Sequence, residues 1–234
     1  MAKRVEWDVL GCGSGRRARV LVVILCVTPF VLCAAAVAQN FNPRIAPPQS
    51  KLLGLTGAEW SERWWKWALE TPATESPLLD TTGSHCGVRQ TGHVWFLAGT
   101  LGPAEPLVRS CTIPEGTTLF FPVANAFCVA EGDGSLEAQR ACVAQFLGDV
   151  TSMQVEIDGV AVESLESYRF QSSPFDLMLP SDNIFGAPAG LYTPTAADGV
   201  YLTVRPLPPG EHTIHIRTEF GAESIDVTYQ LTVG

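Results

Sequence analysis

The clearest periodic pattern in the chain is an amphipathic stretch from residue 56 to about residue 70. Thr56 and Glu59 are spaced as a capping box, which predicts that a helix begins there, and Pro72 ends it. With about 100° between successive residues, the apolar side chains fill one arc of this helix. That arc consists of Trp60, Trp64, Trp65, Trp67, Ala68 and Leu69. We expect a tryptophan-rich helix that closes the open side or end of a β-sandwich, with Trp65 partly exposed at the edge of the buried face.

Beyond residue 81 the period of the pattern changes to two, which is typical of β-strands. Turns containing Gly or Pro separate the alternating segments, and Asp158-Gly159 is a strong hairpin signal. The predicted strands are 93–98, 107–113, 117–123, 153–157, 160–162, 168–170, 175–178, 200–204, 213–218 and 225–233. A second, weaker helix is predicted for residues 135–147, after a Gly-Asp-Gly turn.

About ten short strands, with helices that do not alternate with them, predict a mainly-β fold. We expect a single antiparallel two-sheet β-sandwich over residues 55–234, which includes the helix at 56–70. Strict alternation of apolar and polar residues over 225–233 indicates a strand with one buried and one wet face. Residues 39–54, with prolines among polar residues, are expected to form an extended tether.

The first 38 residues have the three parts of a secretory signal peptide. Arginines at positions 16, 17 and 19 precede an apolar run over residues 20–38, which ends in an Ala-Val-Ala cleavage site. We therefore expect cleavage after Ala38 and a secreted or periplasmic protein. An uncleaved N-terminal membrane anchor is the alternative, because the apolar run is long enough to span a bilayer.

Charge narrows the range of partners. Residues 39–234 hold ten of the fifteen basic residues and twenty-two of the twenty-four acidic ones, so their formal net charge is −12. A charge of this sign argues against nucleic acid and against anionic lipid. We expect contact with a membrane only through an uncleaved N-terminal segment.

Four cysteines remain beyond residue 38, and an even number in an exported protein predicts two disulfides. Of the three possible connectivities we favour Cys86–Cys111 and Cys128–Cys142, because each closes a local loop. A metal site at His85-Cys86 is the alternative, but no C-x-x-C or H-x-x-x-H spacing supports it. We expect neither a metal nor a cofactor.

Several motifs occur together in the chain. They are the tryptophan helix, Val94 to Gly99, Pro114-Glu115-Gly116, Phe120 to Val123 with Asn125 and Cys128, and Pro209 to Ile214. This combination resembles a family of uncharacterised exported bacterial proteins and covers nearly all of the chain beyond the leader. The resemblance implies an exported, mainly-β protein with a tryptophan-rich helix near its mature N-terminus. It implies no activity and no active site.

The candidate binding residues are polar or amphipathic side chains, several of them beside apolar strands. Arg109 could hold a carboxylate or a sugar acid with two parallel hydrogen bonds, or it could form a buried ion pair with Asp80 or Glu115. A partly exposed tryptophan could stack on a sugar ring, although burial is the simpler interpretation of the helix as a whole. The candidates are Asp80, Gln90, Trp95, Arg109, Asn125 and Trp65.

Other patterns that might carry chemistry are weaker. Aspartic proteases carry an Asp-Thr-Gly motif, and this chain has a similar run with one extra threonine, Asp80-Thr81-Thr82-Gly83. We therefore interpret Asp80 as a residue that caps its own loop. An acidic loop with oxygens at alternate positions is reminiscent of a Ca²⁺ site, but it lacks the twelve-residue spacing of an EF-hand, so we interpret it as a solvated, helix-capping turn. Its residues are Glu131, Asp133, Ser135 and Glu137. His212 follows a Pro-Pro-Gly turn, where a hydrogen-bonded structural role is expected.

The sequence therefore favours a non-catalytic module of the cell envelope that binds a small ligand, a glycan or an envelope protein. The residues beyond the leader contain no G-x-S-x-G motif and no nucleotide-binding loop. The alternative is a hydrolase that acts on envelope polysaccharide, with Asp80 and Glu115 as its two carboxylates.

Overall fold

The computed structural model of the protein describes residues 44–101, 105–129, 134–221 and 223–234. The expected signal peptide and residues 39–43 of the expected tether lie outside the described residues. The helices are α1 (Gly57–Leu69) and α2 (Leu136–Gly148), with 3-10 helices at Ala73–Glu75 and Leu165–Tyr168. The strands are β1 (Val94–Phe96), β2 (Leu107–Ile113), β3 (Thr118–Cys128), β4 (Val150–Ile157), β5 (Val160–Ala161), β6 (Arg169–Gln171), β7 (Phe175–Leu179), β8 (Gly190–Val204), β9 (Gly210–Phe220) and β10 (Glu223–Val233).

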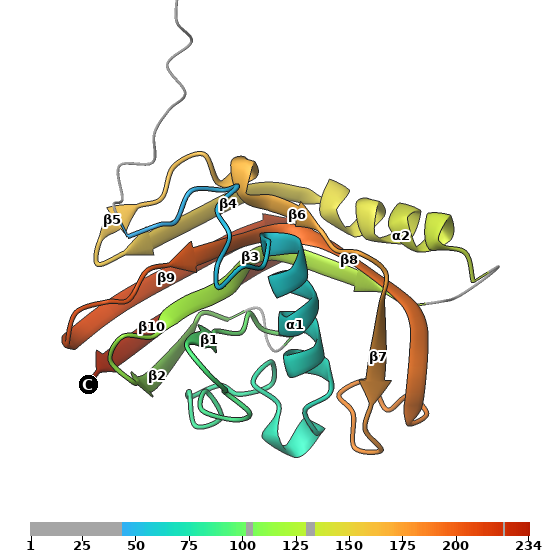
Figure 1. The fold of residues 1–234 in the computed structure, drawn as a ribbon, viewed down its shortest axis with the longest axis horizontal. Helices are drawn as coiled ribbons and strands as arrows, with labels where there is room; N and C mark the ends of the chain where they lie inside the picture. The colour runs from blue at the N-terminus through green and yellow to red at the C-terminus, as the bar shows by residue number, and fades with distance from the viewer. Residues whose placement is uncertain (1–43, 102–104, 130–133, 222) are drawn as a thin grey trace, which may run out of the picture. The chain divides into compact units, whose positions relative to one another are not determined.

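Within the described residues the strands form two five-stranded sheets, which confirms the mainly-β sandwich (Figure 1). The first sheet has the order β1-β3-β8-β6, and β7 pairs with the N-terminal part of β8; the order of the second is β2-β10-β9-β4-β5. The predicted hairpin at Asp158-Gly159 joins β4 to β5, and both of its turn residues have positive φ.

Two strand pairs, β1 with β3 and β2 with β10, are parallel, so the expectation of purely antiparallel sheets is wrong for them. For the first pair, the connection that matters is the short turn after Ile113. It carries the chain from the second sheet to the first and does not pair the strands that it joins. The next strand, β3, then lies beside β1 and runs in the same direction.

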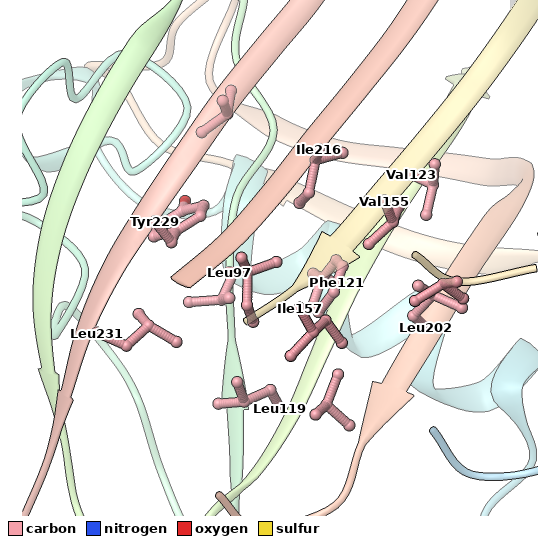
Figure 2. Close-up of a cluster of buried hydrophobic side chains, with 14 of the residues drawn as sticks. Leu97, Leu119, Phe121, Val123, Val155, Ile157, Leu202, Ile216, Tyr229 and Leu231 are labelled. Carbon is pink, nitrogen blue, oxygen red and sulfur yellow. The ribbon is translucent and has the colours of Figure 1, made fainter. Parts of the chain in front are cut away.

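The main core lies between the two sheets (Figure 2). In β2 every second residue is buried, from Leu107 to Ile113, and the residues between them are exposed. The alternation predicted for the last strand is also present, since Val227, Tyr229 and Leu231 are each at most 2% exposed. Period-two patterning thus places one face of the second sheet against the first.

Helix α1 covers the outer face of the first sheet and does not close an end of the sandwich. The expected capping box is formed, with Thr56 and Glu59 bonded to each other through backbone and side chain. Trp64 lies in a second core together with Phe120 and Tyr201, and its indole N–H donates to the Leu97 carbonyl at 2.9 Å. The first sheet is therefore covered on both faces, by α1 on one side and by the second sheet on the other.

Strand β8 is longer than expected, because only residues 200–204 were predicted as strand. Its residues 195–202 are all buried, so the strand shows no alternation there. Asp198 and Gly199 are typical of turns, but here each has a structural reason. Asp198 accepts two hydrogen bonds from the Arg169 guanidinium, at 3.0 and 2.9 Å. A Cβ at Gly199 would lie 2.6 Å from the Ala124 carbonyl oxygen.

The described part of the expected tether, residues 44–54, begins alongside the end of β8. Ile45 is buried and forms a β-bridge with Val204. The backbone N–H of Ala46 donates to the Thr203 carbonyl at 2.9 Å. The first residues that the structure describes therefore extend the first sheet beyond its named strands.

Both expected disulfides are present. Cys86–Cys111 ties the loop before β1 to β2, with 6.1 Å between the Cα atoms. Cys128–Cys142 ties the end of β3 to α2, with 6.3 Å between the Cα atoms. Arg140 also fastens α2 to the first sheet, because its guanidinium donates to the carbonyls of Ala197 and Ser172.

Candidate functional site

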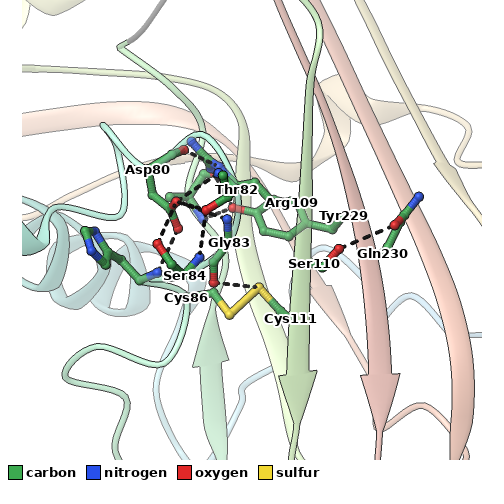
Figure 3. The surroundings of a disulfide bond; sticks show 12 residues. Asp80, Thr82, Gly83, Ser84, Cys86, Arg109, Ser110, Cys111, Tyr229 and Gln230 are labelled. Carbon is green, nitrogen blue, oxygen red and sulfur yellow. Dashed lines mark hydrogen bonds between the residues drawn. A yellow bond between two sulfur atoms is a disulfide. The ribbon is translucent and has the colours of Figure 1, made fainter.

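Asp80 is a structural residue that organises its own loop (Figure 3). Its carboxylate accepts hydrogen bonds from the backbone N–H groups of Thr82, Gly83 and His85, at 2.9, 3.0 and 2.8 Å. Burial acts to raise the pKa of Asp80, but these hydrogen bonds outweigh it and hold the pKa below its ordinary value. The side chain is only slightly exposed, so its oxygens are used within the loop.

Arg109 is fully buried, and its hydrogen bonds go to neutral oxygens. Its Nε donates to the Asp80 carbonyl at 2.8 Å, and its Nη1 donates to the Ala98 carbonyl and the Tyr229 hydroxyl at 2.9 and 2.7 Å. Within the described residues no ion pair joins Arg109 to Asp80 or to Glu115, so the expected ion pair is absent. Arg109 instead holds the loop at residues 80–99 against the second sheet.

Gln90 and Trp95 belong to the same structural region. The Gln90 amide donates to the carbonyls of Cys86 and Phe96 and accepts from the Phe96 N–H, all at 2.8–2.9 Å. Trp95 is half-buried against the main core. Gln90 therefore fixes the loop to β1, and it holds both backbone polar groups of one extended residue at once.

Trp65 and Asn125 make their contacts elsewhere. Trp65 is 5% exposed, contrary to the expectation of partial exposure, and its ring lies 4.6 Å from that of Phe127. The Asn125 amide donates to the Tyr201 hydroxyl at 3.2 Å. Burial raises the pKa of Tyr201, so its phenol stays protonated. Both predicted residues line a cavity of about 110 Å³, which is too small for most ligands.

The remaining candidates either form hydrogen bonds within the fold or lie outside the described residues. The ring nitrogens of His212 lie 2.9 Å from an Asp158 carboxylate oxygen and from the Pro208 carbonyl. The Ser135 hydroxyl accepts from the Ala138 N–H and caps α2, whereas Glu131 and Asp133 lie outside the described residues. Among the side chains that the structure describes, no group of three or more His, Cys, Asp or Glu could hold a metal ion.

A larger hollow lies beside α2, between this helix, the end of β3 and the β7–β8 hairpin. We call it the α2 groove and define it by the side chains that matter below: Phe127, Phe146, Phe185, Tyr192, Gln139 and the Cys128–Cys142 disulfide. Its volume is about 580 Å³, within the range of ligand sites, and its lining is mainly apolar. Phe146 and Phe185 are 59% and 47% exposed, which is unusual for side chains of their size.

Gln139 is the polar residue of the α2 groove that stands out. Its side chain is 2% exposed, yet neither its Nε2 nor its Oε1 has a hydrogen-bond partner among the described residues. The Tyr192 hydroxyl, in contrast, donates to the Pro188 carbonyl at 2.8 Å. Since an unsatisfied buried polar group costs about 1–3 kcal/mol, this amide calls for a functional explanation.

Sequence reasoning missed this groove, although a signal existed. Gln139, Cys142, Val143 and Phe146 have the spacing i, i+3, i+4, i+7, which places them on one face of a helix. A glutamine in an otherwise apolar helical stripe is the pattern that marks the site. The other walls of the groove come from residues far away in the sequence, so its shape could not be inferred.

The fold and the groove define a disulfide-linked, two-sheet β protein with an apolar hollow beside its second helix. No family model matches the chain, and no curated protein matches it.

Proposed function

We propose that the protein is an exported, non-catalytic module of the cell envelope that binds its ligand or partner in the α2 groove. The observation that carries the proposal is a groove of about 580 Å³ with aromatic walls and one unsatisfied polar group. Binding sites combine apolar walls, which supply affinity, with a few placed polar groups, which fix orientation.

Two observations support an extracytoplasmic location. Disulfides persist in oxidising compartments, and this chain has two. Residues 1–38 have the pattern of a signal peptide with cleavage after Ala38. In the described part of the chain no helix is long and apolar enough to cross a membrane.

The geometry does not favour the alternative of a polysaccharide hydrolase. Both carboxylates of such an enzyme must reach the glycosidic bond, one on either side. Asp80 is 7% exposed and its oxygens are bonded within the loop, whereas Glu115 is exposed in the turn after β2. We therefore do not retain this pair as a catalytic site.

The proposal is tested on oxidised protein that begins at Gln39. Thermal unfolding is followed with panels of neutral apolar compounds, peptides, sugars, sugar acids and Ca²⁺. A ligand at a hundred times its Kd stabilises a fold by about 2.7 kcal/mol, which is readily measured. We expect at least one of these classes to bind.

Two variants place the binding in the groove. Phe146→Glu puts a charge at the rim of the α2 groove and should abolish binding, whereas Leu191→Glu changes an equally exposed side chain of the β7–β8 hairpin and should not. Binding that is unaffected by Phe146→Glu, turnover of a glycan, or no stabilisation by any panel would overturn the proposal.

A further inference from the structure

We infer that the α2 groove takes a short, uncharged, apolar peptide segment of another protein, and that Gln139 holds one residue of this peptide by its backbone. The inference rests on the proposed function and names the class of partner.

The first argument is the chemistry of the Gln139 amide. A primary amide offers an acceptor oxygen beside donor N–H groups, and both sides of this one are unpaired within the described residues. An extended peptide residue presents its N–H and its C=O toward the same side, as a strand does to its neighbour. Both atoms are closed to solvent in the structure, so the side chain has to turn toward the groove, where one such residue can satisfy both sides of the Gln139 amide.

The protein already contains this arrangement once. Gln90 accepts from the N–H of Phe96 at 2.9 Å and donates to the carbonyl of Phe96 at 2.8 Å, and Phe96 lies in strand β1. A glutamine side chain thus holds both backbone groups of an extended aromatic residue in this fold. We assign the same role to Gln139, with the extended residue supplied by a partner.

The second argument is charge. Among the described residues that line the α2 groove none is charged, so nothing there compensates the dehydration of an ionised ligand. Residues 39–234 carry a formal net charge of −12, which further disfavours carboxylates and phosphates. The occupant is therefore neutral where it contacts the groove.

The third argument separates a peptide from a sugar or a small molecule. A glycan would bring several hydroxyl groups that need partners, and the Tyr192 hydroxyl already donates to Pro188. A small molecule is enclosed over most of its surface, whereas Phe146 and Phe185 stand exposed at the rim. Aromatic rings on an open groove suit the apolar side chains of a peptide that continues beyond it.

The probe is a fluorescent peptide with blocked ends, Gly-Ser-Phe-Val-Leu-Phe-Ser-Gly, whose binding to the oxidised protein is measured by anisotropy. A series of the same peptide is N-methylated at one central residue at a time, which removes a single backbone donor. We expect N-methylation at one position to weaken binding to the wild type about tenfold, which corresponds to about 1.4 kcal/mol. N-methylation at the other positions should have little effect on binding.

Gln139→Leu has nearly the same size and removes an unsatisfied amide, so it should fold. In this variant the sensitivity to N-methylation should disappear. The matched control is Gln145→Leu on the exposed side of α2, which should retain the wild-type profile. Thermal unfolding of each variant checks that the fold is intact.

The outcomes distinguish the two proposals. If the peptides do not bind but a sugar or a small molecule binds in a manner sensitive to Phe146→Glu, the peptide inference fails and the proposed function stands. Peptide binding that is equally tight with every N-methylated probe, or unchanged in Gln139→Leu, overturns the role of Gln139. If peptides bind and Phe146→Glu has no effect, both proposals fail.

Discussion

The buried Asp80 shows how hydrogen bonds to one side chain affect the stability of the fold. Three backbone N–H groups donate to its carboxylate, so the charged form is stabilised although the side chain is nearly inaccessible. Hydrogen bonds lower the pKa of Asp80 in the folded state relative to the unfolded state. This difference links the stability of the loop to pH.

The consequence is a predicted loss of stability in acid. Because the folded pKa of Asp80 is the lower one, its contribution is fully present above the unfolded pKa of about 3.9 and is lost as the pH falls through the folded value. Asp80→Asn should lower the free energy of unfolding by about 2 kcal/mol at neutral pH, and by less in acid. Urea unfolding at several pH values measures this, with the exposed Glu115→Gln as control. A difference that stays constant with pH would contradict the assignment.

Gly199 gives a second prediction at this scale. Alanine there would place its Cβ 2.6 Å from the Ala124 carbonyl oxygen, and backbone cannot move away easily in the middle of a sheet. Gly199→Ala should destabilise the protein by about 1–3 kcal/mol, measured by urea unfolding. Gly148→Ala is the matched control, because a Cβ at Gly148 meets nothing within 4 Å. Equal stability of the two variants would show that β3 and β8 do not pack this closely.

At the scale of elements, α1 is the segment whose role the sequence described best. Its capping box and its arc of tryptophans predicted both its start and its buried face. The sequence pattern could not show which surface the helix covers. That surface includes Phe120 from β3, Leu177 from β7 and Tyr201 from β8, strands that all lie far from α1 in the chain.

The burial of α1 predicts a large effect of a single tryptophan. Trp64→Ala removes a side chain that is 1% exposed, together with its hydrogen bond to Leu97, and should cost about 3–5 kcal/mol of unfolding free energy. Lys66→Ala, on the other side of the helix, removes an ion pair with Glu62 and should cost less than 1 kcal/mol. Thermal or urea unfolding compares the two. Similar losses would mean that α1 is not packed as described.

At the scale of the whole molecule, sequence patterns predicted the fold class better than the site. Alternation is clear in strands with one exposed face, such as β2, and it failed for the first part of β8 because both faces of that strand are covered. The candidates Asp80, Gln90 and Arg109 were chosen as polar groups near apolar strands, and they proved to be bonded to the backbone, whereas Trp95 is half-buried against the main core. For Gln139 neither polar atom of the side chain has a partner among the described residues, and its place in an apolar helical stripe was the one sequence signal for it.

Export is the prediction that concerns the entire chain. Expression in a bacterial host with a functional secretion pathway should give a protein outside the cytoplasm whose N-terminal residue is Gln39, because Ala36-Val37-Ala38 has the form of a cleavage site. Mass spectrometry of the intact protein determines this. An N-terminus at Met1 in the membrane fraction would instead identify residues 20–38 as an uncleaved anchor.

The strand order has a further consequence for how the chain acquires its structure. Strand β2 pairs with β10, the last strand, and the helix α1 needs Tyr201 of β8 to cover its tryptophans. Because the chain is synthesised from its N-terminus, the tryptophans of α1 therefore remain exposed until β8 has been made. Such a topology has a high contact order, and its folding is correspondingly slow. Deletion of β10 alone would leave both β2 and β9 with an open edge.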